Sequence, residues 1–307
     1  MKTVTIIGSG AVGALYGWRL AQALGNENVC FLAEGERRER YLQNGFVING
    51  KQLFFNIVKP EDATPTDLVL IATKNHQLKE ALEAIKKAVG ENTSIISLLN
   101  GTQSEVLLTE AYGSDRVLYG FAVGLSSRHE KNHIDFTEEG KIVFGEKDNK
   151  RSHQVQEIEQ LFTLAHIQYL VPQDIQVELW KKFMLNTAFN TLSSICLATY
   201  GDFKAESLKT LAWKTSKEVQ TVAKAEGILL TDEMIETNYK TILSLGSEGK
   251  TSMFQDMEAG RKTENQWFCG TVSQLGLKHD IPTPVCDTLS LLVEGCEQAR
   301  FRHLAVQ

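Results

Sequence analysis

Hydrophobic and polar positions divide the chain into two parts with different periods. Up to residue 173, short apolar runs of strand type alternate with amphipathic stretches, beginning with a strand at residues 3–7 and a helix at 14–24. From residue 174 onward, apolar positions recur with helical spacing and strand signals vanish. The pattern predicts an α/β fold, with a doubly wound sheet in residues 1–173 and an all-helical domain in residues 174–307.

A glycine-rich turn connects the first predicted strand to the first predicted helix. It reads G-S-G-A-V-G over residues 8–13, the fingerprint of dinucleotide-binding Rossmann folds. Gly8 permits the tight turn, Gly10 lets the backbone approach a pyrophosphate, and Gly13 lets the helix pack close to the strand. The helix N-terminus then faces the phosphates; the alternative is an ordinary tight turn without a ligand. The candidate cofactor contacts at this turn are Gly8, Gly10, Ala11, Val12 and Gly13.

The residue that follows the second predicted strand, 29–32, bears on the choice of cofactor. Glu34 stands there, roughly 20 residues beyond the glycine turn, where an acid accepts a hydrogen bond from the ribose 2′-hydroxyl of NAD. Arg37, Arg38 and Arg40 follow closely, and an arginine nearby can hold the 2′-phosphate of NADP. The alternative is a solvated charged helix face, so the sequence leaves NAD and NADP open.

Two further apolar runs, 67–72 and 94–99, predict central parallel strands. Ligands bind beyond the carboxyl ends of the strands in an open α/β sheet. Lys74 is therefore a candidate for the cofactor phosphates or ribose, and Asn100 for a cofactor or catalytic contact. The alternatives are a surface lysine and an Asn-Gly turn.

Weaker signals complete the first domain. Asn44-Gly45 and Asn49-Gly50 are hairpin turn signals. The patterns predict strands at 46–48, 53–58, 117–123, 134–136, 141–144 and 167–171, and helices at 78–89 and 154–165.

The first long helix of the second half, predicted at 175–197, carries an unusual polar row. Lys182, Asn186 and Asn190 are spaced i, i+4 and i+8, so they share one face. Buried amides and ammonium groups are costly unless paired. The face is thus either exposed to water or lines a polar cleft, and spacing alone leaves both open.

Four more helices are expected after it. They are predicted at 205–226, at 231–243, from 253 through Glu264, and at 285–300, whereas 271–277 is ambiguous. Ser252-x-x-Gln255 resembles a capping box at the start of the third. Glu264 precedes Trp267 and Phe268 and is expected to be partly buried.

Composition narrows the class of protein. Hydrophobic residues make up 42% and charged residues 23%, as in soluble globular proteins. A net charge of −6 argues against a nucleic-acid surface, and no apolar run approaches the roughly 20 residues of a membrane helix. No signal peptide is recognised, so a cytoplasmic protein with five reduced cysteines is expected. His129 and His133 lack a third ligand nearby, and no metal site is expected.

Taken together, the motifs resemble the ketopantoate reductase (2-dehydropantoate 2-reductase) family over essentially the whole chain. The resemblance rests on more than the glycine turn. Its carrying motifs are Gly8-x-Gly10-Ala11-x-Gly13, Thr73-Lys74-x-x-Gln77, Leu99-Asn100-Gly101, Trp180-x-Lys182-x-x-x-Asn186-x-x-x-Asn190, Ser252-Met253-x-Gln255-Asp256 and Thr263-Glu264.

The resemblance implies NADPH-dependent reduction of 2-dehydropantoate to (R)-pantoate, on the path to pantothenate and coenzyme A. By position, Lys182 resembles the family's general acid, and Glu264 its second catalytic acid. It implies no metal, and a small 2-keto acid as partner; a homodimer is compatible with it. The other positions carried over are Asn186, Asn190 and Ser252 for the substrate, Asn100 between nicotinamide ribose and substrate, and Lys74 and Gln77 near the cofactor.

Two positions depart from the family pattern. Glu34 stands where the family commonly has an arginine for the 2′-phosphate, so NADH is an alternative to NADPH, with Arg37 or Arg38 as substitutes. Tyr200 stands where some members have an asparagine, which favours a paralogue acting on another 2-keto acid. The remaining alternatives are a related 3-hydroxy acid or opine dehydrogenase and a non-catalytic dinucleotide-binding sensor.

Overall fold

The computed structural model describes residues 1–130 and 132–304. The chain divides into two units, Met1–Ile175 (unit 1) and Gln176–Gln307 (unit 2). Each unit has its own buried apolar core.

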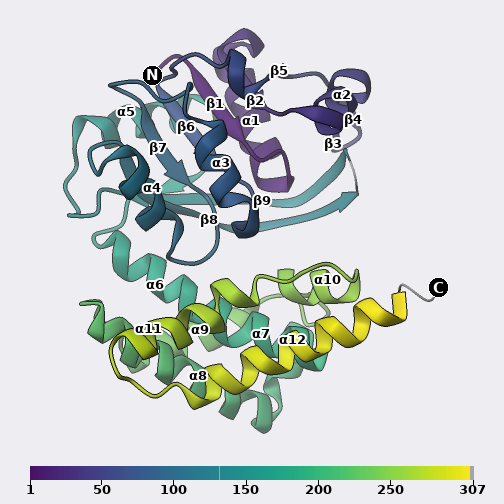
Figure 1. Ribbon diagram of the computed structural model, residues 1–307, viewed down its shortest axis with the longest axis vertical. Helices are drawn as coiled ribbons and strands as arrows, with labels where there is room; N and C mark the ends of the chain where they lie inside the picture. The colour runs from purple at the N-terminus through teal and green to yellow at the C-terminus, as the bar shows by residue number, and fades with distance from the viewer. Residues whose placement is uncertain (131, 305–307) are drawn as a thin grey trace. The chain divides into compact units, whose positions relative to one another are not determined.

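A mixed β-sheet runs through unit 1 (Figure 1), in the order β4-β3-β9-β8-β7-β6-β1-β2-β5, with β10 paired to β9. All neighbours from β8 to β5 in that order are parallel, whereas β8 and β9 form a long antiparallel hairpin. The strands are β1 (Val4–Ile7), β2 (Val29–Leu32), β3 (Phe46–Ile48), β4 (Lys51–Leu53), β5 (Asn56–Val58), β6 (Leu68–Ile71), β7 (Ser94–Ser97), β8 (Val117–Glu130), β9 (His133–Gly145) and β10 (Tyr169–Leu170).

Helices cover both faces of the parallel strands because successive strand residues point to opposite sides. Ile6 and Leu70 join one apolar core together with residues of α1 and α5. Ile7 and Ile71, the next residues along the same strands, join a second core with residues of α3 and α4. The doubly wound sheet is therefore confirmed. The helices of unit 1 are α1 (Ala11–Leu24), α2 (Gly35–Asn44), α3 (Leu78–Ala84), α4 (Ser104–Tyr112) and α5 (His153–Leu164), with short 3₁₀ turns η1 (Asn26–Asn28), η2 (Pro60–Asp62) and η3 (Asn75–Gln77).

Several elements of unit 1 differ from the prediction. The strand expected at 53–58 is two strands, because Lys51–Leu53 pairs with β3 while Asn56–Val58 pairs with β2. Gly45 does not form a hairpin turn; it ends α2, and its N–H donates to the carbonyl of Tyr41 at 2.9 Å. The hairpin prediction is right for Asn49-Gly50, which connects β3 to β4.

Elements between residues 78 and 145 also differ from the prediction. The three short strands expected between 117 and 144 are two long strands, joined in one hairpin with a bulge at Ser126 and Ser127. The predicted helix at 78–89 ends early, at Ala84. Helix α4 was not predicted from the sequence at all.

Unit 2 is helical, as predicted (Figure 1). Its apolar core includes Phe183, Phe203, Val219, Met253 and Phe268, contributed by helices far apart in the sequence. Its elements are α6 (Ile175–Leu185), the π-helical η4 (Asn186–Asn190), α7 (Thr191–Cys196), η5 (Tyr200–Lys204), α8 (Glu206–Ala225), α9 (Asp232–Ser244), α10 (Ser252–Glu258), η6 (Asn265–Trp267), α11 (Cys269–Lys278) and α12 (Pro284–Leu304).

Two helix predictions in unit 2 need correction, and one ambiguous stretch is resolved. The helix expected at 175–197 is interrupted by the π-helical segment Asn186–Asn190. The helix expected to extend from 253 through Glu264 ends at Glu258. The ambiguous stretch at 271–277 is helical and lies within α11.

Other features of the described residues bear on the class of protein. No helix among them has the length and apolar content that crossing a bilayer requires. Within the same residues, His, Cys, Asp and Glu side chains form no group of three that could hold a metal; the side chain of His129 lies outside them. All five cysteines are free thiols.

Candidate functional site

The glycine turn of unit 1 is built so tightly that larger residues are excluded. Gly8 has a φ of +95°, and a Cβ added to it would lie 2.4 Å from the carbonyl carbon of Ala72. A Cβ at Gly13 would lie 1.8 Å from the carbonyl oxygen of Gly8. At Gly10, by contrast, an added Cβ would meet nothing within 4 Å, so the space beside that backbone is open.

The start of α1 fits a phosphate group. Gly10 is its N-cap and has no side chain that could accept a hydrogen bond from the first N–H groups of the helix. Ala11 and Val12 supply the first two of these N–H groups. These groups and the positive end of a 14-residue helix are suited to an anion. Nearby, the hydroxyl oxygen of Thr73 is buried and has no hydrogen-bond partner within the described chain. An open, donor-rich turn with an orphaned polar atom beside it fits a dinucleotide.

Four neighbouring parallel strands bring the predicted cofactor residues to one edge of the sheet. Strands β7, β6, β1 and β2 are adjacent and parallel, so their carboxyl ends lie at the same edge. Asn100 follows β7, Lys74 follows β6, Gly8 follows β1 and Glu34 follows β2. Unit 1 therefore gathers residues that are up to about ninety positions apart in the sequence.

A residue that sequence reasoning did not single out joins two of these strand ends. The buried side chain of Asn75 donates from Nδ2 to the carbonyl oxygen of Asn100 at 2.8 Å. Lys74 is exposed just before it, and Gln77 closes the 3₁₀ turn with its N–H bonded to the Lys74 carbonyl at 2.9 Å. The sequence did carry a signal for this role of Asn75. It is an amide directly after the lysine at a strand end, where a side chain can bond to the loop after the neighbouring strand.

The start of α2 presents both an acid and a base. Glu34 is the N-cap, exposed and in extended conformation, and its side chain makes no capping hydrogen bond. Arg37 is exposed one turn later, whereas Arg38 is partly buried and its Nη1 donates to Glu39 at 3.2 Å. The carboxylate of Glu34 therefore stands in solvent at the carboxyl end of β2.

The glycine turn and α2 are connected by a side-chain hydrogen bond. Ser9, inside the turn, donates from its hydroxyl to the phenolic oxygen of Tyr41 at 2.7 Å. Tyr41 is buried and is stacked on Phe46, with ring centroids 4.5 Å apart. The contact links the predicted phosphate-binding turn to the helix that carries Glu34.

In unit 2, the π-helical segment begins and ends at two of the predicted substrate residues. Asn186 and Asn190 are its first and last residues, and they are 7% and 6% exposed. Lys182 lies one turn earlier, in the last turn of α6, and is partly buried. Residues four apart drift by about 40° round an α-helix, and the wider π turn reduces that drift. The two amides thus stay on one side of the helix and are buried rather than solvated.

Ser252 reaches this segment from α10. Asn190 donates from Nδ2 to the hydroxyl oxygen of Ser252 at 3.3 Å, so the two predicted substrate residues are in contact. The capping box predicted for Ser252 is wrong: Thr251 is the N-cap, and its hydroxyl accepts from the N–H of Phe254 at 3.1 Å. Because Thr251 caps the helix, the hydroxyl of Ser252 is available for Asn190.

The two adjacent lysines of α6 are in different surroundings. Lys181 donates to both carboxylate oxygens of Glu178 at 3.1 Å, one turn earlier on the same helix. Its carbonyl accepts from Nδ2 of Asn238, a buried residue of α9, at 2.9 Å. Lys182, and not Lys181, is the lysine spaced four and eight residues before Asn186 and Asn190, so it stays the candidate for an acid.

Glu264 lies in the short connection between α10 and α11, not on a helix as predicted. It is 2% exposed and is the residue before η6, with φ −92° and ψ 21°. Its carbonyl accepts from the N–H of Trp267 at 2.9 Å. Its neighbours Thr263 and Asn265 are also buried and hydrogen-bonded to α12. A buried carboxyl held in a fixed loop is suited to orienting a partner group.

Tyr200 is directed towards the loop that precedes Ser252. Its hydroxyl donates to the carbonyl of Lys250 at 3.3 Å, and a Cβ on Gly249 would lie 2.6 Å from its ring. Burial raises the pKa of the Tyr200 phenol above its ordinary value, so the group stays protonated and able to donate at neutral pH. The phenol thus supports the Ser252 loop.

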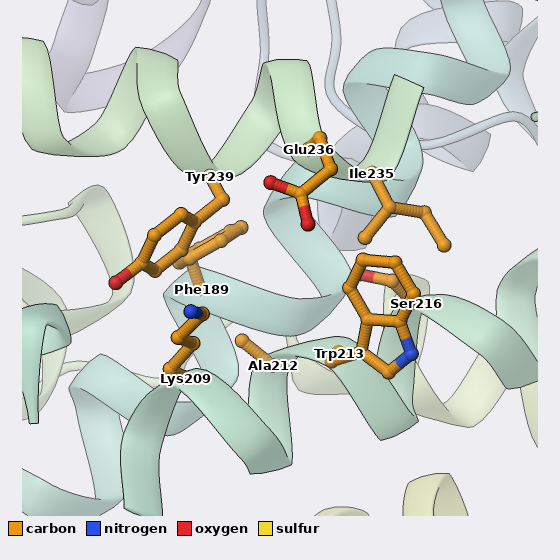
Figure 2. Close-up of a pocket in the computed structure, with 8 residues that line it drawn as sticks. All are labelled: Phe189, Lys209, Ala212, Trp213, Ser216, Ile235, Glu236 and Tyr239. Atoms are coloured by element: carbon orange, nitrogen blue, oxygen red, sulfur yellow. The ribbon is translucent and has the colours of Figure 1, made fainter. Parts of the chain in front are cut away.

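A hollow in unit 2 borders the π-helical segment, because Phe189 is among its lining residues. Figure 2 shows the rings of Phe189, Trp213 and Tyr239 around it, with Lys209 and Glu236 among its other lining residues. Nζ of Lys209 lies 5.4 Å from the centroid of the Tyr239 ring. No predicted site residue lines this hollow.

Models of one protein family match both parts of the chain. Residues 4–149 match the family model described as ketopantoate reductase PanE/ApbA, and residues 174–297 match its C-terminal model. The chain belongs to the ketopantoate reductase family. It is therefore a member of a family of NAD(P)-dependent 2-keto acid reductases, as the resemblance predicted.

Individual relatives agree with the family but are distant. The uncharacterised oxidoreductase YkpB of Bacillus subtilis is 27% identical over 290 residues, covering 92% of this chain and 95% of the relative. A 2-dehydropantoate 2-reductase of Streptococcus pyogenes is 27% identical over 302 residues, covering 96% and 97%.

Solved structures share the fold over almost the whole chain. The 2-dehydropantoate 2-reductase of Geobacter metallireducens matches with a TM-score of 0.85 at 26% identity, covering 95% of this chain and 99% of that one. D-mandelate dehydrogenase, solved with NADH and anilino(oxo)acetate, has a TM-score of 0.88 at 21% identity, covering 97% and 99%; it shows the fold alone. The roles of individual site residues stay predictions.

Proposed function

We propose that this protein reduces a small 2-keto acid to the 2-hydroxy acid with a reduced nicotinamide dinucleotide, with ketopantoate as the first substrate to consider. The observation that carries the proposal is the contact between Asn190 and Ser252, with Asn186 in the same π-helical segment and Lys182 one turn before it. Amide and hydroxyl donors suit a carboxylate and neighbouring oxygens, and a lysine supplies a proton. Such a set would suit the binding and reduction of a keto acid.

The first 173 residues would hold the cofactor. The turn from Gly8 to Gly13 would bind the pyrophosphate, Glu34 the adenosine ribose, and Lys74, Gln77 and Asn100 the remainder of the dinucleotide, as their strand-end positions support. When bound, the dinucleotide supplies the hydride that the reaction needs.

The remaining residues, 174–307, would hold the substrate and complete the reaction. During the reduction, Lys182 would donate its proton to the carbonyl oxygen, which gains the π electrons of the C=O bond. The ammonium group stabilises the growing negative charge, which is larger in the transition state than in the keto acid. Ser252 and Asn190 would hold the carboxylate, Asn186 a substrate oxygen, and Glu264 the orientation of lysine and substrate.

Glu34 favours NADH over the family's default, NADPH. Its exposed carboxylate at the end of β2 can accept from a ribose 2′-hydroxyl, and it would repel a 2′-phosphate. Arg37 is exposed one turn away and is the residue that would support NADPH if the carboxylate turned aside. We therefore infer that both cofactors are used, with NADH preferred.

One observation favours a 2-keto acid other than ketopantoate. Tyr200 occupies the position where some family members have an asparagine, and its hydroxyl is bonded to the Lys250 carbonyl. A hydrogen-bonding group expected for the substrate is thus replaced by a larger one that supports the Ser252 loop. This change would alter the shape of the substrate site and leave the acid chemistry of Lys182 intact.

Turnover with a panel of 2-keto acids tests the proposal. The protein is incubated with ketopantoate, pyruvate, 2-ketoisovalerate and benzoylformate, each with NADH and with NADPH, and cofactor oxidation is followed by absorbance. Rapid turnover of ketopantoate supports the first candidate, and a clear preference for another acid supports the second. Cofactor binding without turnover of any 2-keto acid would contradict both and favour a sensor.

A further inference from the structure

We propose that Glu297, near the end of α12, is a positioning residue that holds the loop carrying Glu264 in its working conformation. The inference rests on the proposed function, because it assigns Glu297 to the reaction through Glu264. Nothing in the sequence motifs pointed to Glu297, which is separated from Glu264 by more than thirty residues.

One carboxylate oxygen of Glu297 fixes the residue before Glu264 twice. Oε1 accepts from the backbone N–H of Thr263 at 2.8 Å and from the Thr263 hydroxyl at 2.6 Å. Hydrogen bonds to an ionised acceptor are among the stronger ones in proteins. Thr263 is 1% exposed, so water does not readily replace these bonds.

The hydroxyl of Thr263 also bonds to the residue that follows Glu264. Oγ1 of Thr263 accepts from the backbone N–H of Asn265 at 3.3 Å while it donates to Glu297. The residues on both sides of Glu264 are therefore joined through one side chain. This short bridge restricts the backbone angles of Glu264 itself, which lie in the sparsely populated bridge region.

A second attachment to α12 holds the other end of the loop. Nδ2 of Asn265 donates to the carbonyl of Ser290 at 3.1 Å and to its hydroxyl at 3.0 Å. Ser290 and Glu297 are two turns apart on α12, and hence on the same side of that helix. Helix α12 is therefore hydrogen-bonded to the loop on both sides of Glu264, and these bonds restrict the backbone that positions the Glu264 carboxyl.

Substitutions that keep or remove the acceptor test this role. Glu297→Ala removes both bonds, whereas Glu297→Gln keeps a carbonyl oxygen that can accept them. The matched control is Glu294→Ala, which removes the same charge from an exposed position on the same helix. We expect Glu297→Ala to lower kcat by about 10- to 100-fold with the dinucleotide Kd changed less than about twofold, and Glu297→Gln to recover most of that loss. An unchanged kcat in Glu297→Ala, or a Gln variant as impaired as the Ala variant, would overturn the proposal.

A second measurement does not depend on activity. Amide hydrogen exchange of the peptide spanning residues 259–268 is compared among the wild type, Glu297→Ala, Glu294→Ala, Thr263→Val and Thr263→Ser. Glu297→Ala and Thr263→Val should speed exchange by about tenfold or more, because each removes a hydrogen bond that holds the loop. Glu294→Ala and Thr263→Ser should leave exchange unchanged. Thr263→Val also serves if Glu297→Ala fails to fold.

The two readouts separate failure of this inference from failure of the proposed function. If the wild type reduces no 2-keto acid, the proposed function fails, and exchange still decides whether Glu297 restrains the loop. If the wild type is active, Glu264→Gln is inactive and exchange is unchanged in Glu297→Ala, the function stands and the positioning role is wrong.

Discussion

The side-chain amide of Asn190 donates to the hydroxyl of Ser252 at 3.3 Å across 62 positions of sequence. Asn190 ends the π-helical segment, and Ser252 begins α10 just after the residue that caps it. π-Helical segments inside longer helices are frequent at functional sites. The contact therefore joins an unusual backbone segment to a helix start, and each side chain keeps further hydrogen-bonding capacity for a ligand.

If Ser252 binds the substrate carboxylate, removing its hydroxyl weakens substrate binding. We expect Ser252→Ala to raise the KM for the 2-keto acid by about 10- to 100-fold, because a hydrogen bond to a charged group contributes about 1.5–3 kcal/mol. The dinucleotide KM should be unchanged. Ser247→Ala, in the exposed loop before α10, is the matched control. Equal KM values for Ser252→Ala and the control would remove Ser252 from the substrate site.

Lys182→Ala should nearly abolish turnover. Loss of a general acid lowers kcat by about 10²- to 10⁴-fold, while the dinucleotide Kd should stay within about twofold of the wild type. Lys181→Ala is the control, since it removes an adjacent lysine that is paired with Glu178 in a partly exposed ion pair contributing less than about 1 kcal/mol. Steady-state kinetics and dinucleotide titration measure both variants. If Lys181→Ala is the inactive one, the assignment of the acid is reversed.

Cofactor preference should follow the charge at residue 34. Glu34→Arg is expected to move the ratio of kcat/KM for NADPH over NADH upward by about tenfold or more, because a repulsive carboxylate is replaced by a partner for the 2′-phosphate. Glu36→Arg makes the same charge change on the exposed first turn of α2 and should alter the ratio little. If both substitutions changed the ratio equally, the effect would come from the overall charge of the surface and not from a contact between residue 34 and the ribose.

Some strands of unit 1 could be predicted from the sequence, whereas others could not. Strands at 29–32 and 46–48 were predicted with the observed bounds because apolar runs between polar turns are local signals. The strand expected at 53–58 failed because Leu53 ends β4, which pairs with the adjacent β3, whereas β5 pairs with β2; between them, Phe54 is half exposed and Phe55 is buried. The pairing of β5 with β2 is set by tertiary contacts and leaves no local pattern.

The candidate site divides in the same way. The strand-end positions of Gly8, Lys74 and Asn100 follow from the rule that parallel strands share an edge, so the sequence could place them. The π-helical turn could not be predicted, because Asn186 and Asn190 also fit an ordinary helix. Likewise, two hydroxyls at the start of α10 compete for the cap, and only the packed structure selects the first of them.

Stability should depend on pH through Glu226, at the end of α8. Partial burial raises the pKa of this carboxyl, but hydrogen bonds from Lys278, at 2.7 Å, and from His279 outweigh it and leave the pKa below its ordinary value. A depressed carboxyl pKa stabilises the fold above the unfolded-state value, about 4.3, and that contribution is lost as pH falls through the folded-state pKa.

Glu226→Gln tests that relationship. The substitution should lower the free energy of unfolding by less than about 1 kcal/mol at neutral pH, and the difference from wild type should vanish well below about pH 4. Urea unfolding at several pH values measures it. A difference that grew towards acid pH would mean that the carboxyl is not stabilised in its ionised form.

Transfer of deuterium from the cofactor to the substrate would show directly whether this protein reduces a 2-keto acid. The protein is incubated with ketopantoate, or with the best 2-keto acid of the panel, and NADH deuterated at the transferable C4 position, and the product is examined by mass spectrometry. We expect the wild type to form a 2-hydroxy acid with one deuterium at C2, and Lys182→Ala to form it at least about 10²-fold more slowly. Recovery of the unchanged 2-keto acid, or of a hydroxy acid without deuterium at C2, would contradict it.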